Sequence, residues 1–210
     1  MKTLWTFLFS FILMTSFSQE NKYEQAMLNA IAKMNSSVTI SEFLDVANAF
    51  ERISQSENAE WIPLYHAAFA YIVIGFQEPD AAKKDPYLDK AQQFLDRAFK
   101  IAPEESELFA LQAFLYPARI VVDPMTRGME FMGKMNAALD LATQKNPENP
   151  RSYYLRAVSL LNMPESFGGG AAVAKPLFET AKLKFDNFQP LSPISPNWGK
   201  EQNEAELGKL

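Results

Sequence analysis

Apolar residues recur at helical spacing along most of the chain, and strand-like alternation is rare. This pattern predicts amphipathic helices, because residues three and four positions apart share one face of an α-helix. Thr39 followed by Glu42 has the spacing of a capping box, which favours a helix start at this point. Proline, glycine and polar residues separate the segments. The predicted helices cover residues 26–34, 43–53, 61–76, 87–101, 106–116, 129–144, 150–161, 171–185 and 197–207.

A set of small and large apolar residues that ends in proline occurs twice. The two copies are Ala91, Leu95, Ala98, Pro103 and Met135, Leu139, Ala142, Pro147, and a looser third copy is Ala174, Phe178, Ala181. The two prolines are 44 residues apart (147 − 103). A fixed period of this size is typical of arrays of helix pairs, in which each pair buries its apolar face against the next pair.

The order of alanine, large apolar residue, alanine and proline resembles the second helix of a tetratricopeptide repeat, over residues 60–186. The resemblance implies an all-α, right-handed helical-repeat array of about three helix pairs. An N-terminal helical hairpin at 21–56 and a proline-rich tail with a capping helix at 187–210 would flank it. The period exceeds the roughly 34 residues of that family, and we expect the excess in loops around 79–86 and 117–128. HEAT or armadillo repeats also fit this period, so both geometries stay open.

The whole chain also resembles small exported tetratricopeptide proteins of Gram-negative bacteria. The features that carry this resemblance are the Pro-Glu-Ser-Phe-Gly-Gly-Gly motif at 164–170 and the Pro-x-x-Pro-x-Trp-Gly tail at 193–199. The likeness implies no known activity.

The first 18 residues have the features of a secretory signal peptide. One lysine precedes an apolar run at 4–14, and Ser16 and Ser18 are small residues suited to cleavage. The run is much shorter than the roughly 20 residues that span a bilayer. The sequence has no cysteine, which excludes a lipoprotein. We therefore expect a single helical domain at 19–210 in the periplasm or outside the cell.

Composition narrows the classes of function. The formal net charge of −5 argues against nucleic acid as a partner, which requires a concentrated basic surface. The absence of cysteine excludes disulfides, thiol catalysis and cysteine-ligated zinc. His66 is the sole histidine and lies in an apolar segment without a second ligand at metal-binding spacing, so a hydrogen-bonded core position is favoured. With no catalytic constellation, we expect no enzyme and no cofactor.

Two motifs have both a structural and a ligand-binding interpretation. The glycines at 168–170 precede a predicted helix and could cradle an anion, but no Gly-Lys-Ser/Thr follows, so a tight turn is favoured. A methionine-rich stretch could form an adaptable binding surface, although a soft core is favoured. Its members are Met125, Met129, Met132 and Met135.

The tetratricopeptide resemblance implies a concave groove lined by the first helix of each pair. The groove positions are Tyr65, Phe69, Phe114, Arg151 and Tyr154. We expect a non-catalytic scaffold in the cell envelope that binds an envelope protein or a peptide there. The alternative is a small-ligand-binding accessory subunit, for example of a transporter, with a pocket enclosed by the long loops. We expect the tail to cover the Tyr154 side of the groove and to leave Tyr65, Phe69 and Phe114 for the partner.

The signal peptide gives a direct prediction. Exported protein should begin at Gln19, because the small residues before it suit signal peptidase. Mass spectrometry of the N-terminal peptide from the envelope fraction checks this. Recovery of exported chains that retain Met1 would contradict it.

Overall fold

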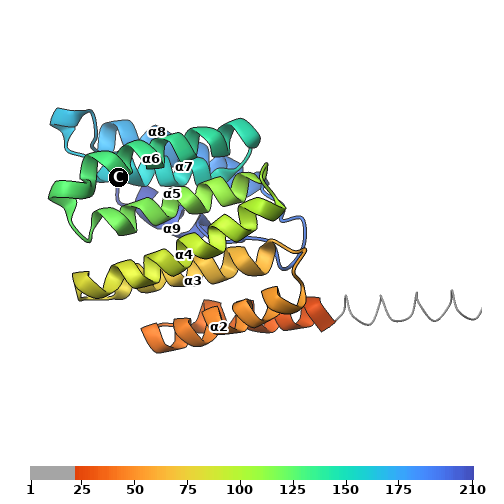
Figure 1. Cartoon of the computed structure of the whole chain (residues 1–210). Helices are drawn as coiled ribbons and strands as arrows, with labels where there is room; N and C mark the ends of the chain where they lie inside the picture. The colour runs from red at the N-terminus through yellow and green to blue at the C-terminus, as the bar shows by residue number, and fades with distance from the viewer. Residues whose placement is uncertain (1–21) are drawn as a thin grey trace, which may run out of the picture.

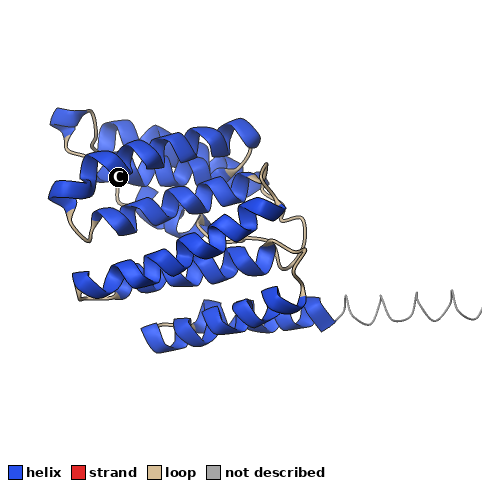
Figure 2. Cartoon of the chain, viewed as in Figure 1, coloured by secondary structure: helices blue, strands red, loops and turns tan. Residues whose placement is uncertain are grey.

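The computed structural model describes residues 22–210, and these form helices joined by loops, with no strand among them (Figures 1 and 2). The predicted signal peptide at 1–18 lies outside the described residues. Residues 22–36 form the first described helix. It is followed by α2 (Ile40–Ser56), α3 (Ile62–Gln77), α4 (Ala81–Ile101), α5 (Ser106–Ile120), α6 (Pro124–Lys145), α7 (Pro150–Asn162), the 3₁₀ turn η1 (Glu165–Phe167), α8 (Ala171–Asn187) and α9 (Lys200–Leu207).

Consecutive helices pack as pairs, and the pairs stack on one another. The helix at 22–36 pairs with α2, α3 with α4, α5 with α6, and α7 with α8, and α9 packs on α8 (Figure 1). The predicted all-α array of helix pairs with an N-terminal hairpin and a C-terminal capping helix is confirmed. Within the described part of the chain, no helix combines the length and the apolar character needed to cross a membrane.

The repeated apolar positions are the contacts between these helices. Every helical member of the three copies is buried, including the alanines Ala91, Ala98, Ala142 and Ala181. The alanines let two helix backbones approach closely. The repeated pattern in the sequence therefore corresponds to the repeated contacts between helices. The capping box at Thr39 and Glu42 is also present, since each residue bonds to the backbone N–H of the other.

The expectation of long loops around 79–86 and 117–128 is wrong, because most of these residues are helical. α4 begins at Ala81, where the Asp80 side chain accepts a hydrogen bond from the N–H of Ala82. Pro86 lies inside α4, and Pro117 lies inside α5. The excess residues of the 44-residue period therefore lengthen helices instead of loops.

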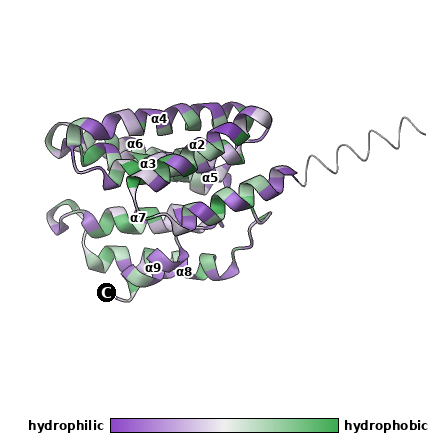
Figure 3. Cartoon of the chain, turned by 90° about the horizontal axis from the view of Figure 1, so that it is seen from below, coloured by the Kyte–Doolittle hydropathy of each residue, from purple (hydrophilic) through white to green (hydrophobic). Residues whose placement is uncertain are grey.

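Tertiary contacts hold the helical turn around Pro86 in place. The Lys84 ammonium donates a hydrogen bond to the Gly75 carbonyl at 2.9 Å. Asp85 forms ion pairs with Arg119 at 3.0 Å and with Arg127 at 2.8 Å. The Arg127 guanidinium holds the pKa of Asp85 below its ordinary value. Local sequence favours a loop here, but these bonds to α3, α5 and α6 stabilise the helix. One face of α4 is buried against the array through Leu88, Ala91, Phe94, Leu95 and Ala98, and its exposed face is mainly hydrophilic (Figure 3).

The C-terminal tail, residues 188–199, runs from α8 along the stack to α3 and returns to α9 (Figure 1). Its capping helix begins at Lys200, later than the expected Asn197. Gly199 has a φ of 100°, a left-handed conformation that glycine adopts without strain. A Cβ atom at this position would lie 2.9 Å from the Phe185 ring. The glycine therefore sets the point at which the tail turns into α9.

The buried alanines give the first prediction from the fold. Ala98→Leu and Ala142→Leu should each lower the free energy of unfolding by about 1 to 3 kcal/mol, because a larger side chain overpacks a helix contact. Ala137→Leu is the matched control, since Ala137 is exposed on the same helix as Ala142. Thermal and urea unfolding measure the difference. Equal stability of the Ala142 and Ala137 variants would contradict the packing role.

Candidate functional site

A cavity of about 1070 Å³ lies between α5, α6 and α7. Its lining is mainly apolar and carries no charged side chain. The main contributors are Phe76, Phe114, Pro117, Ile120, Val121, Met125, Met129, Met132, Met135, Tyr154, Leu155, Val158, Met163 and Phe167. Ligand sites typically enclose roughly 300 to 1000 Å³ and are mostly apolar. By size and lining, this cavity is the strongest candidate site in the described part of the chain.

Gly128 on α6 keeps part of this space open. It lines the cavity, and a Cβ atom added there would meet no heavy atom within 4 Å. Glycine inside a helix costs roughly 0.5 to 1 kcal/mol relative to alanine. The helix therefore gives up stability at a position where any side chain would project into unfilled space.

Apolar side chains surround the mouth of the cavity. Met125, Met129 and Phe167 line it and are 93%, 94% and 77% exposed. Met132 and Met135 lie deeper, and Met135 is buried. The favoured interpretation of the methionine-rich stretch as a soft core is therefore correct only for its inner end. Flexible, polarizable thioethers adapt to the shape of an apolar ligand.

Few polar groups reach the cavity. The Ser159 hydroxyl donates to the Met132 sulfur at 3.9 Å, and the Asn162 amide donates to the Val158 carbonyl at 2.8 Å. Burial raises the pKa of Tyr154 to about 12, so its phenol stays protonated at neutral pH. The cavity is suited to recognition by apolar contact, with little directional hydrogen bonding.

The tail covers the predicted partner groove. The Trp198 indole N–H donates to the Tyr65 hydroxyl at 2.7 Å. The Trp198 ring lies 5.3 Å from Phe69, 5.2 Å from Phe114 and 6.4 Å from Tyr154, measured between ring centroids. The expectation that the tail leaves Tyr65, Phe69 and Phe114 free is therefore wrong. Phe114 and Tyr154 contact Trp198 and also line the cavity.

Arg151, the fifth predicted groove residue, is completely buried. Its guanidinium pairs with the Glu107 carboxylate at 2.8 Å and donates to the Pro196 carbonyl at 2.8 Å. It also lies over the Phe188 ring, 4.8 Å from the centroid. Arg151 thus binds the tail of its own chain. Sequence reasoning missed Glu107, although Glu107 and Arg151 lie 44 residues apart, at the second position of α5 and of α7.

His66 is a hydrogen-bonded core residue, as predicted. Its Nε2–H donates to the Ile194 carbonyl of the tail at 2.9 Å, and its ring stacks on Phe50. Burial lowers the pKa of His66 to about 4. Among the described residues, no group of three or more histidine, cysteine, aspartate or glutamate side chains could hold a metal ion.

The glycine motif forms a tight turn, as predicted. Gly168 and Gly170 have positive φ values of 84° and 99°. The N–H groups of residues 168–170 donate to the carbonyls of Glu165, Pro164 and Leu160. These amides are occupied inside the turn and do not cradle an anion. The turn instead follows η1, which carries Phe167 at the mouth of the cavity.

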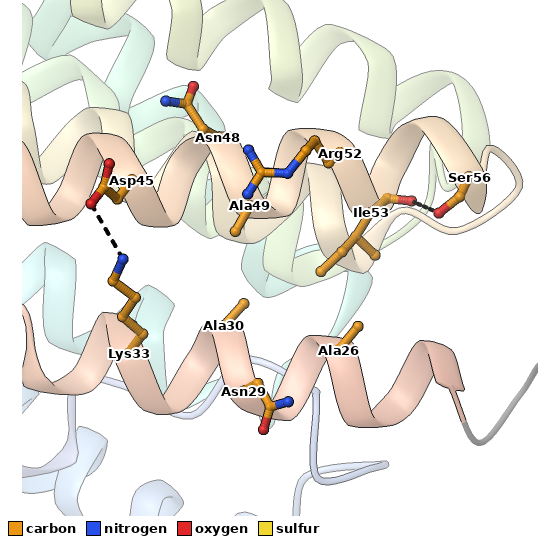
Figure 4. A pocket seen from close by; sticks show the side chains of 10 residues that line it. All are labelled: Ala26, Asn29, Ala30, Lys33, Asp45, Asn48, Ala49, Arg52, Ile53 and Ser56. Carbon is orange, nitrogen blue, oxygen red and sulfur yellow. Dashed lines mark hydrogen bonds and ion pairs between the residues drawn. The ribbon is translucent and has the colours of Figure 1, made fainter.

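A second, shallower groove of about 630 Å³ lies between the helix at 22–36 and α2 (Figure 4). Ala26, Ala30 and Ala49 lie along it, and a Lys33–Asp45 ion pair of 3.3 Å crosses it. Both charged side chains are well exposed to solvent. Its open, mixed surface offers less apolar contact than the cavity between α5, α6 and α7.

The structure of this chain is similar to that of a known binding protein. No family model matches the sequence, and no curated protein matches it. The structure is similar to the HusA haemophore from Porphyromonas gingivalis, with a TM-score of 0.80 and 29% sequence identity. The similarity covers 88% of this chain and 90% of that one. The two proteins share the helical fold over nearly their whole lengths.

The buried histidine gives a prediction for pH dependence. The pKa of His66 is about 4 in the fold and about 6.5 in an unfolded chain. The unfolded state binds more protons between these values, so His66 makes stability rise with pH across this range. The parent should therefore lose up to about 3 kcal/mol more stability than His66→Gln between pH 7 and pH 4.

Unfolding of both proteins at the two pH values measures the difference. Burial raises the pKa of Glu107, which gives a slope of opposite sign, but both proteins share this slope. Equal losses of stability in the parent and the variant would show that His66 is not the buried titrating group.

Proposed function

We propose that this chain is a non-catalytic carrier of a haem-type tetrapyrrole, bound in the cavity between α5, α6 and α7. The cavity is the observation that carries the proposal, because it is large, apolar and free of charged side chains. The similarity to a haemophore over 88% of the chain supports the choice of ligand. A binding role requires no catalytic group, which agrees with the lining of the cavity.

The lining suits a flat apolar macrocycle with charged edges. The Phe114 ring on α5 and the sulfur of Met132 on α6 offer aromatic and thioether contacts to the faces of such a ligand. Burial of the ligand's carboxylates among uncharged residues would be costly. These groups would extend through the mouth into water, between Met129 and Phe167.

The lining residues that would hold an iron ion are methionines, through their thioether sulfurs, or Tyr154, through its phenol. Methionine and tyrosine both occur as axial ligands of haem. Tyr154 is a protonated phenol at neutral pH because burial raises its pKa. His66 is bonded to the Ile194 carbonyl and does not line the cavity. The Met132 sulfur accepts from the Ser159 hydroxyl at 3.9 Å, and Met163 also lines the cavity.

This proposal develops the small-ligand alternative of the sequence analysis. The groove expected to take a protein or peptide is filled by the tail, whereas the cavity is open. An exported carrier fits a signal peptide at 1–18 and a helical domain at 19–210 in the periplasm or outside the cell. The expected envelope partner would then be the protein that receives the ligand.

Titration with haemin, followed by its absorption spectrum, tests the proposal. The parent should give a saturable spectral change. Gly128→Leu should weaken binding at least about tenfold, because its side chain fills the cavity, while melting stays the same or rises slightly. Gly133→Leu is the matched control, since Gly133 lies in the open on the same helix and does not line the cavity.

Metal-free protoporphyrin serves as a second ligand and separates contacts with the macrocycle from contacts with iron. Binding of both ligands with similar affinity would assign recognition to the macrocycle. A parent that binds neither ligand, or glycine variants that bind equally well, would contradict the proposal.

A further inference from the structure

Trp198 is a half-buried side chain of the tail that contacts three helices of the array. Its indole packs against aromatic rings of α3, α5 and α7, namely Phe69, Phe114 and Tyr154. Its N–H donates to the Tyr65 hydroxyl at 2.7 Å. Burial raises the pKa of Tyr65 far above its ordinary value, so this hydroxyl stays neutral and accepts the bond.

Two of the three rings that Trp198 contacts belong to a wall of the cavity. Phe114 and Tyr154 line the cavity, and Trp198 does not. Phe114 also packs against Phe76, another lining residue, at 5.3 Å between centroids. A single layer of aromatic rings therefore separates the tail from the space proposed for the ligand.

Buried hydrogen bonds fix the tail on both sides of Trp198. The Ile194 carbonyl accepts from His66 of α3, and the Pro196 carbonyl accepts from Arg151 of α7. Beyond the tail, Asn203 of α9 donates to the Phe178 carbonyl of α8 at 3.0 Å. The position of the indole is thus set by bonds to α3, α7 and α8 that do not involve the cavity.

We infer that Trp198 is a positioning residue for the ligand, which holds the Phe114 and Tyr154 rings against the cavity. This inference rests on the proposed function. Without the indole, each of the two rings would lose one of its aromatic packing partners, and the ring would have room to tilt into the vacated space. A binding site keeps its affinity when the side chains that contact the ligand are locked by a supporting layer.

The coupling must act in both directions. If the docked tail favours ligand binding, then a bound ligand favours the docked tail by the same factor. Ligand in the cavity should therefore slow amide exchange in the tail, although the tail does not touch it. The helix at 22–36 lies at the other end of the array and should show no change.

Two measurements test the inference. The first is the haemin affinity of Trp198→Ala, Trp198→Phe and Leu191→Ala. We expect about a tenfold loss for Trp198→Ala, within the range of typical coupling factors, and recovery of most of it in Trp198→Phe, which keeps an aromatic ring. Leu191→Ala is the control, because Leu191 lies in the same tail and is 96% exposed.

The second measurement is hydrogen exchange of the parent chain, followed by mass spectrometry, with and without saturating haemin. We expect slower exchange in residues 188–199 and unchanged exchange in residues 22–36. This measurement decides the matter if Trp198→Ala does not fold. Unchanged tail exchange on ligand binding, or a folded Trp198→Ala protein with parental affinity, overturns the inference while the proposed function stands. A parent that binds no tetrapyrrole overturns both.

Discussion

The guanidinium of Arg151 is fully removed from water, and this buried charge constrains how the C-terminal half assembles. An ionised group in the interior is tolerated only when it is paired and hydrogen-bonded. Its partners are the Glu107 carboxylate of α5 and the Pro196 carbonyl of the tail. α5, α7 and the tail must therefore pack together before the Arg151 guanidinium has both of its partners. The tail is consequently part of the folded array and not an appendage to it.

The docked tail closes one face of the array, whereas another face is open. The tail carries Trp198 and Ile194 onto α3, α5 and α7, and so covers the aromatic side chains that a bare repeat array would expose. The terminal faces of repeat arrays require such a cover. No segment in the described part of the chain plays this role for the mouth between α6 and η1, where methionine and phenylalanine side chains remain exposed. Exposed apolar patches are a common feature of interaction sites, which supports the ligand site proposed for this chain.

The fold could be predicted from the sequence because its information is local and periodic. The spacing of Ala98 and Ala142 encodes helix contacts, and the Thr39–Glu42 pair encodes a helix start. The cavity could not be predicted in this way. Residues 117–128 contain prolines and a glycine that favour a loop locally, but ion pairs between distant helices stabilise the helical form. Recognition of Glu107 and Arg151 required comparison of equivalent positions in successive repeats, since neither residue signals burial alone.

The cavity and the tail lie on opposite sides of one aromatic layer. The tail side is stabilised by specific contacts, whereas the cavity side is not. On the tail side, buried hydrogen bonds and ring packing stabilise a single conformation. On the cavity side, Gly128 lowers the stability of its helix, and the exposed methionines leave apolar surface in contact with water. Proteins commonly accept such local costs where a ligand binds. Phe114 and Tyr154 pack against Trp198 of the tail and also line the cavity. The fixed tail therefore restrains two rings of a cavity whose other walls include flexible methionines. In the proposed complex, an apolar ligand would gain contact area without having to order the ring layer itself, which would lower the entropic cost of binding.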